Sequence, residues 1–138
     1  MSVVTYGAAL AAHNIDIPAH LVAQAEVPVL TGLQLQGDLA VIPTRPSAKP
    51  GVPVPAGGVQ VVAGEATGNT HWLDAATGPV FWAPATSGRQ DLGVVTVPEG
   101  SVAVLTHTDE HGANAVGPGC YLVRRQREMA DEVRLVAD

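Results

Sequence analysis

The chain has 138 residues and a formal net charge of −6, and only 14% of its residues are charged, whereas about 25% is usual in soluble domains. This length suits one globular domain with a single core. The negative charge argues against a general nucleic-acid binder, because such proteins need a positive surface to attract phosphates. No apolar stretch reaches the length of a transmembrane helix, and the single Cys120 excludes an internal disulfide.

The first 32 residues differ in character from the rest of the chain. They contain the apolar run Gly7-Ala8-Ala9-Leu10-Ala11-Ala12 and are too apolar for a disordered tail. We therefore predict an N-terminal arm over residues 1–32, packed on the domain or on a neighbouring copy, and a β-rich domain over residues 33–138. His13 and His20 have no carboxylate at a spacing that would join them, so they are expected to be surface or capping residues. The N-terminus lacks the basic start and apolar block of a signal peptide, so the expected location is the cytoplasm or an assembled particle.

Short apolar or alternating segments separated by turn residues fill the chain from Leu33 onward. Leu33-Gln34-Leu35-Gln36 alternates, Gly37-Asp38 marks a turn, and the proline-rich segment 44–58 is expected to be an exposed loop. Further strands are predicted at residues 39–43, 57–63, 79–83, 94–97, 102–105, 121–128 and 132–136. Pro98-Glu99-Gly100 lies between two of these strands and predicts a β-hairpin.

Seven to nine short strands with frequent turn signals favour an all-β fold, either a small antiparallel sandwich or a barrel. Aromatic residues make up only 4% of the sequence, so each large ring matters for filling the core. Trp72 and Trp82 are expected to lie in that core, close to Phe81 or Tyr121.

Histidines, carboxylates and glycines gather in two stretches, 64–72 and 105–111. His107 and His111 are four residues apart and face the same way in a strand or a helical turn, and Asp109 shares that face if the segment is extended. An adjacent strand that carries His71 would complete a site suited to zinc, iron or nickel. The candidate metal ligands are His71, His107, His111, Glu65, Asp109 and Glu110. The alternative interpretation is that residues 107–111 form a polar hairpin tip.

A pattern of separated short stretches is recognisable from about residue 36 onward. Its residues here are Gln36, Gly37, Asp38, Gly64, Glu65, Thr67, Gly68, His71, Thr106, His107, Glu110, His111, Pro118, Tyr121, Val123, Gln126, Arg127 and Glu128. In these residues the chain resembles a widespread family of small, uncharacterised bacterial proteins with a Gly-Glu-x-Thr-Gly-His-x-His stretch and a Gln-Arg-Glu strand near the C-terminus. Asn69 stands where that family has the first histidine of His-x-His, which removes one candidate ligand. The resemblance implies no activity.

Two function classes follow from these features. Low charge density, the proline-rich loop, the arm and the missing histidine favour a non-enzymatic β-rich assembly subunit of the coat or capsid-decorating type. Such a subunit would pack through its apolar arm and low-charge surface into a homo-oligomer or a larger particle, with no nucleic-acid or membrane partner. The competing hypothesis is a His-rich metal-binding protein or a cupin-like enzyme that depends on a divalent transition metal. Pro98-Glu99-Gly100 followed by His107 is loosely similar to the cupin pattern.

Overall fold

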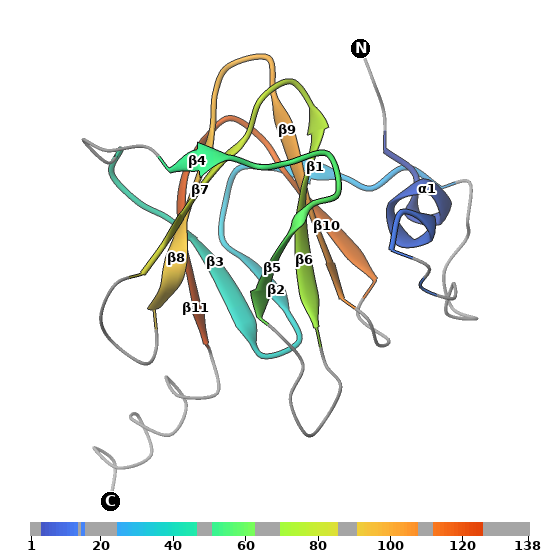
Figure 1. Cartoon of the computed structure of the whole chain (residues 1–138), viewed down its shortest axis with the longest axis horizontal. Helices are drawn as coiled ribbons and strands as arrows, with labels where there is room; N and C mark the ends of the chain where they lie inside the picture. The colour runs from blue at the N-terminus through green and yellow to red at the C-terminus, as the bar shows by residue number, and fades with distance from the viewer. Residues whose placement is uncertain are drawn as a thin grey trace, which may run out of the picture.

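Two β-sheets packed face to face form the body of the protein in the computed structural model, which describes residues 4–13, 15, 25–46, 51–62, 70–85, 91–107 and 112–125 (Figure 1). The elements are α1 (Tyr6–Ala11), β1 (Val29–Leu30), β2 (Gln34–Gln36), β3 (Leu39–Pro43), β4 (Val52–Pro53), β5 (Val59–Val62), β6 (His71–Thr77), β7 (Phe81–Pro84), β8 (Asp91–Val97), β9 (Val102–His107), β10 (Ala113–Val116) and β11 (Gly119–Arg125). One sheet has the order β1-β10-β9-β6-β5 and the other β2-β3-β11-β8-β7-β4. The predicted all-β fold is confirmed, and of the two predicted architectures, sandwich or barrel, it is the sandwich.

The strands are more numerous than the sequence indicated. Eleven occur within the described ranges, where seven to nine were expected, and two of them, β1 and β4, have only two residues. Among these eleven strands, every pairing is antiparallel except that of β1 with β10. The proline-rich segment contains β4, which pairs with β7 at the edge of the six-stranded sheet. The predicted strand at residues 132–136 lies outside the described residues.

The turn at Pro98-Glu99-Gly100 exists, but the hairpin predicted there is wrong. Ser101 N–H donates to Pro98 O at 3.0 Å, and Gly100 has a φ of 83°. The turn joins β8 of the six-stranded sheet to β9 of the five-stranded sheet, and these two strands do not pair. The turn residues specify a reversal of the chain, whereas the packing of each strand decides which sheet it enters.

Side chains from the facing sides of the two sheets form the main core. Its members are Leu39, Val41, Val61, Leu73, Val80, Trp82, Val95, Val97, Ala103, Leu105, Val116, Tyr121 and Val123. Trp82 lies in this core as predicted, but Trp72 does not, because it points to the outer side of β6 and is only partly buried. The Tyr121 hydroxyl donates to Gly117 O at 2.8 Å. The pKa of this phenol is raised above its usual value. The larger cause is burial, and the smaller is the electrostatic effect of the neighbouring Cys120.

A second, smaller cluster covers the outer face of the five-stranded sheet, where α1 packs on its own domain (Figure 1). Thr5 caps this helix, since its hydroxyl accepts a bond from Ala8 N–H at 3.1 Å. The cluster combines Ala9 and Val27 with Val104, Ala113 and Ala115, and Val4, Tyr6 and Val102 pack against it. The described part of the predicted arm is therefore folded against the sheet. No helix within the described ranges has the length and apolar character needed to cross a bilayer.

Candidate functional site

Two histidines form a cross-strand pair at adjoining ends of β6 and β9. His71 is the first residue of β6, His107 is the last residue of β9, and the two are directly paired in the antiparallel register. Their side chains lie on the core side of the sheet, the same face as Leu73 and Leu105 two residues along each strand, and each histidine is only 1% exposed. Their rings are stacked, with centroids 4.1 Å apart and planes inclined by 28°. The predicted convergence of these two histidines from separate stretches is thus observed.

The stacking limits what this pair can do with a metal. An imidazole nitrogen binds a metal ion in the plane of its own ring, at about 2.0–2.1 Å. Two nearly parallel stacked planes share no such point close to both rings, so His71 and His107 do not chelate one ion in this arrangement. Four predicted ligands, Glu65, Asp109, Glu110 and His111, lie outside the described residues. Among the residues that the structure describes, no three His, Cys, Asp or Glu side chains form a group that could hold a metal.

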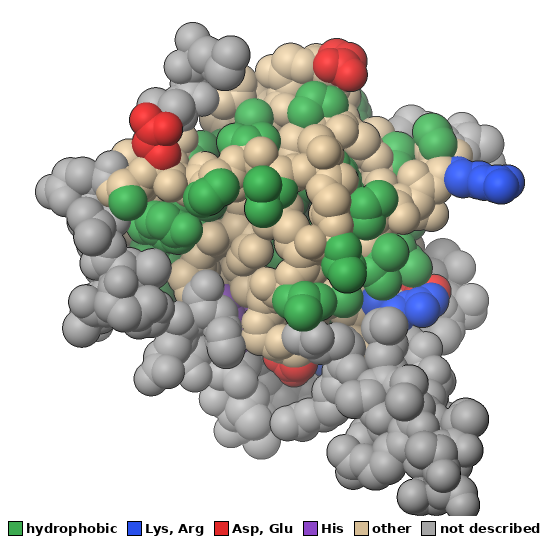
Figure 2. Space-filling view, turned by 180° about the vertical axis from the view of Figure 1, so that it is seen from behind, with side chains coloured by type: hydrophobic (Ala, Val, Ile, Leu, Met, Phe, Trp, Pro, Cys, Tyr) green, Lys and Arg blue, Asp and Glu red, His purple; other side chains and the backbone are tan. Residues whose placement is uncertain are grey.

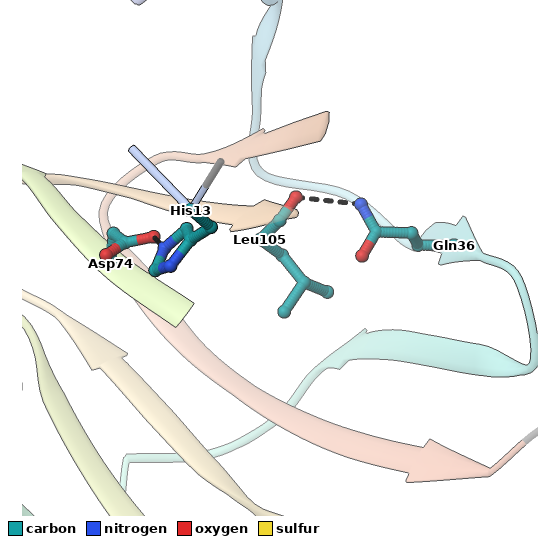
Figure 3. Close-up of polar contacts among 4 residues, drawn as sticks. All are labelled: His13, Gln36, Asp74 and Leu105. Carbon is teal, nitrogen blue, oxygen red and sulfur yellow. Dashed lines mark hydrogen bonds and ion pairs between the residues drawn. The ribbon is translucent and has the colours of Figure 1, made fainter. Parts of the chain in front are cut away.

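A buried glutamine connects His71 to the opposite sheet. Gln36 belongs to β2, is 2% exposed, and donates from Nε2 to Leu105 O at 2.7 Å (Figure 3). The same Nε2 also donates to Asn114 Oδ1 at 2.7 Å. Its Oε1 lies 3.0 Å from His71 Nδ1. One side chain of the six-stranded sheet therefore bridges to two strands of the other sheet and to the histidine pair.

The network extends along the edge of the sandwich to a second glutamine. Gln34 donates from Nε2 to Ala115 O at 3.0 Å and to Leu30 O at 3.4 Å. Asn114 donates from Nδ2 to Gln34 Oε1 at 3.1 Å and to Leu35 O at 3.4 Å. Two glutamines and an asparagine thus form a continuous relay of side-chain amides between the sheets.

The backbone carbonyls at each step fix the direction of this relay. A carbonyl can only accept, so the atoms of Gln34, Asn114 and Gln36 that contact one must be amino groups, and their oxygens point to the next member. Gln36 Oε1 is therefore an acceptor, and His71 must donate to it from Nδ1. In the neutral ring Nε2 then carries the lone pair. The fold thus sets the tautomer of His71 through hydrogen bonds that begin at Leu30 O and Ala115 O.

A carboxylate faces the other nitrogen of His71. Asp38 lies in the turn between β2 and β3, and its Oδ1 is 3.7 Å from His71 Nε2. The Asp38 side chain is 41% exposed, so it connects the buried ring to the surface. Gln36, Asp38, His71 and His107 come from three separate stretches of the sequence and meet at this one place.

A second histidine–carboxylate pair lies on the outer face of the same sheet. His13, which follows α1, approaches Asp74 of β6 with Nε2 and Oδ2 2.6 Å apart (Figure 3). The His13 ring stacks on Trp72 with centroids 4.4 Å apart and planes inclined by 18°. The prediction that His13 is an ordinary surface or capping residue is wrong, because its side chain is 7% exposed and hydrogen-bonded to Asp74. The folding of the chain brings Asp74 to it from 61 residues away.

We expect His13→Ala to loosen the N-terminal segment. The variant loses a hydrogen bond to a carboxylate and a ring stack, which together should lower the free energy of unfolding by about 1–2 kcal/mol. It also uncovers Trp72, so in a Trp82→Phe background the emission maximum should shift to longer wavelength. Asp74→Asn retains an acceptor and should shift less. An unchanged emission maximum in His13→Ala would show that the stack does not form in solution.

The edge strand β2 turns its polar side chains toward the core and its apolar side chain toward solvent, the reverse of the usual arrangement. Gln34 and Gln36 of β2 point inward, while Leu35 and the preceding Leu33 are 55% and 62% exposed. Val29 and Leu30 of β1, the edge strand of the other sheet, are about half exposed. We call these four residues, Val29, Leu30, Leu33 and Leu35, the apolar edge. Figure 2 shows a face of the molecule on which apolar side chains are spread widely, with few charged groups among them.

Comparison with known proteins places the chain in a family without assigning an activity. No curated protein and no solved structure was found to match it. A family model described as "Domain of unknown function (DUF8820)" matches residues 35–126. That region contains Gln36, Asp38, His71 and His107 but neither α1 nor His13. Because the match covers about two-thirds of the sequence, the chain belongs to this family of uncharacterised domains.

Proposed function

We propose that the protein is a non-enzymatic assembly subunit, of the coat or particle-decorating type, that associates with copies of itself through the apolar edge. The observation that carries this proposal is the reversal of β2, which buries two glutamines and exposes leucine. The burial of the glutamines is explained by their hydrogen bonds in the amide relay between the sheets. The exposure of leucines on two neighbouring edge strands is explained if a partner covers them.

The charge distribution favours a second copy as that partner. The chain carries a net charge of −6, so most contacts between two copies bring like charges together. No charged residue occurs between Glu26 and Asp38, and the whole apolar edge lies within this stretch. A two-fold contact would place this uncharged segment against itself. The helix α1 is already packed on its own sheet and is not available for this contact. Within the described part of the arm, Val29 and Leu30 would contribute to it.

Charges introduced into the apolar edge test this proposal. Leu33→Asp and Leu35→Asp each place a carboxylate opposite its own symmetry mate, and like charges across an interface cost several kcal/mol. We expect each variant to raise the dissociation constant of the oligomer by more than about a hundredfold, as measured by sedimentation velocity. The folded state should persist, because both side chains point away from the core.

Val52→Asp is the matched control for these variants. Val52 is 67% exposed and lies on β4, the edge strand at the opposite end of the six-stranded sheet. It should leave the oligomer intact. If Val52→Asp dissociates the oligomer and Leu35→Asp does not, the contact runs through the other edge and the proposal is wrong.

The second candidate function is metal binding: the pairing of His71 with His107 brings the two histidine-bearing stretches together, although the two stacked rings do not themselves chelate one ion. A stoichiometric divalent transition metal in protein purified without a histidine tag would support this alternative, including a cupin-like metal-dependent enzyme. We also propose that the histidine-bearing stretches of this chain correspond to those of the small bacterial proteins that the sequence resembles. The proposed location is the cytoplasm or an assembled particle.

A further inference from the structure

We propose that the outer face of the six-stranded sheet is a second part of the self-association surface, on which another copy of this chain packs face to face. The inference rests on the proposed function and extends it from the apolar edge to a whole sheet face. Three features support it: the apolar row that the strand register builds on this face, the balance of charge beside that row, and the short edge strands next to it.

The strand register aligns apolar side chains across the outer face of this sheet. Leu122 of β11 pairs with Ile42 of β3 on one side and with Val94 of β8 on the other. Val94 in turn pairs with Ala83 of β7. Each of the four directly adjoins a member of the main core along its own strand, so their side chains point outward. Neighbouring strands lie about 4.8 Å apart, so this apolar row is about 14 Å across.

An apolar row of this kind is unusual on a sheet face that meets water. An antiparallel sheet with one solvated face normally alternates apolar side chains toward the core with polar ones toward solvent. All four residues of the row are partly exposed. Within the described ranges, α1 is the only element outside the two sheets, and it packs on the five-stranded one (Figure 1). The described parts of the chain therefore leave the row uncovered.

The charges beside the row favour a second copy as its cover. Arg124 Nε and Asp91 Oδ1 are 2.7 Å apart, and these two residues are the charged ones that the described strands place on this face. They balance each other, whereas the whole chain carries a net charge of −6. Two copies can therefore meet over this face without bringing their excess negative charges directly together.

The apolar edge and this face form one continuous surface. Leu35 of β2 pairs with Ala40 of β3, and Ala40 pairs with Arg124 beside the apolar row. The edge itself is poorly suited to strand addition, because β1 and β2 have only two and three residues. Leu35 O also already accepts a bond from Asn114 Nδ2 at 3.4 Å. Packing of side chains over the sheet face is therefore the contact that suits a second copy.

Cys120 provides a probe of this face in the wild-type protein. It is the only cysteine in the chain, it is partly exposed, and it pairs with Thr96 on the same outer face, two residues from Leu122. A copy packed on the face should shield the thiol. Once about nine-tenths of the chains are associated, labelling by iodoacetamide should be about tenfold slower than in dilute protein, because only free chains react.

Leu122→Asp tests the same face through association itself. We expect it to raise the dissociation constant by more than about a hundredfold in sedimentation velocity, because it places a carboxylate in the centre of the contact. Val52→Asp is again the control, since Val52 pairs with Trp82, whose side chain lies in the core rather than on the outer face. Circular dichroism shows whether each variant is folded, and the labelling of Cys120 needs no variant.

The proposal is overturned if Cys120 reacts as fast in the wild-type oligomer as in dilute protein, or if folded Leu122→Asp associates as tightly as the wild type. Either result leaves the proposed function standing, provided that Leu35→Asp dissociates the oligomer. A wild-type protein that stays monomeric overturns both.

Discussion

Replacement of Trp82 by alanine should lower the free energy of unfolding by about 3–5 kcal/mol, the range found when a large aromatic side chain is removed from a core. Trp82 is 5% exposed and belongs to the main cluster between the sheets. A Cβ added at Gly93 would lie 2.5 Å from Trp82 Cη2, so the ring is packed directly over the backbone of β8.

Trp72→Ala is the matched comparison, because this ring lies on the outer face of β6 under His13. Its loss should cost less than that of Trp82, since Trp72 is only partly buried. Urea unfolding of both variants, followed by circular dichroism, gives the two values. Equal losses for the two tryptophans would contradict the placement of Trp72 outside the main core.

Replacement of Gln36 by leucine should also be severe, at about 3–5 kcal/mol, although leucine is the more hydrophobic residue. The variant leaves His71 Nδ1–H, Leu105 O and Asn114 Oδ1 without their bonds to Gln36, and each buried polar group that loses its partner costs about 1–3 kcal/mol. The unfolding free energy should be measured at low protein concentration, so that self-association does not contribute.

The neighbouring Leu35→Gln reverses this substitution on the other face of β2. Leu35 is exposed, so the change should alter the stability of the single chain by no more than about 0.5 kcal/mol. A severe loss for Leu35→Gln together with a mild one for Gln36→Leu would mean that β2 has the opposite orientation, with its leucine facing the core.

The behaviour of β2 shows what the sequence could and could not predict. The alternation from Leu33 to Gln36 correctly indicates a strand, because a period of two is a property of the extended backbone. It does not indicate which face is buried when both sets of residues can be satisfied inside. Gln34 and Gln36 are buried because carbonyls of β9 and β10 and the Asn114 side chain lie opposite them, and those partners are far away in the sequence.

The candidate site was predictable only in part for the same reason. His71 and His107 follow from their positions at the ends of apolar segments, where adjacent strands could bring them together. Asp38 and Gln36 were visible in the Gln-Gly-Asp stretch but gave no sign that they would face a histidine. His13 and Asp74 are 61 residues apart, and no local spacing predicts their contact.

The central claim, association of identical copies through the apolar edge, is tested most directly by sedimentation equilibrium of the full-length, untagged chain at micromolar concentration. One chain has a mass of 14.1 kDa. The account predicts a mass that is a multiple of this value for the wild-type protein and a return to 14.1 kDa for Leu35→Asp. A wild-type protein that sediments as a single 14.1 kDa species over the whole concentration range would contradict it.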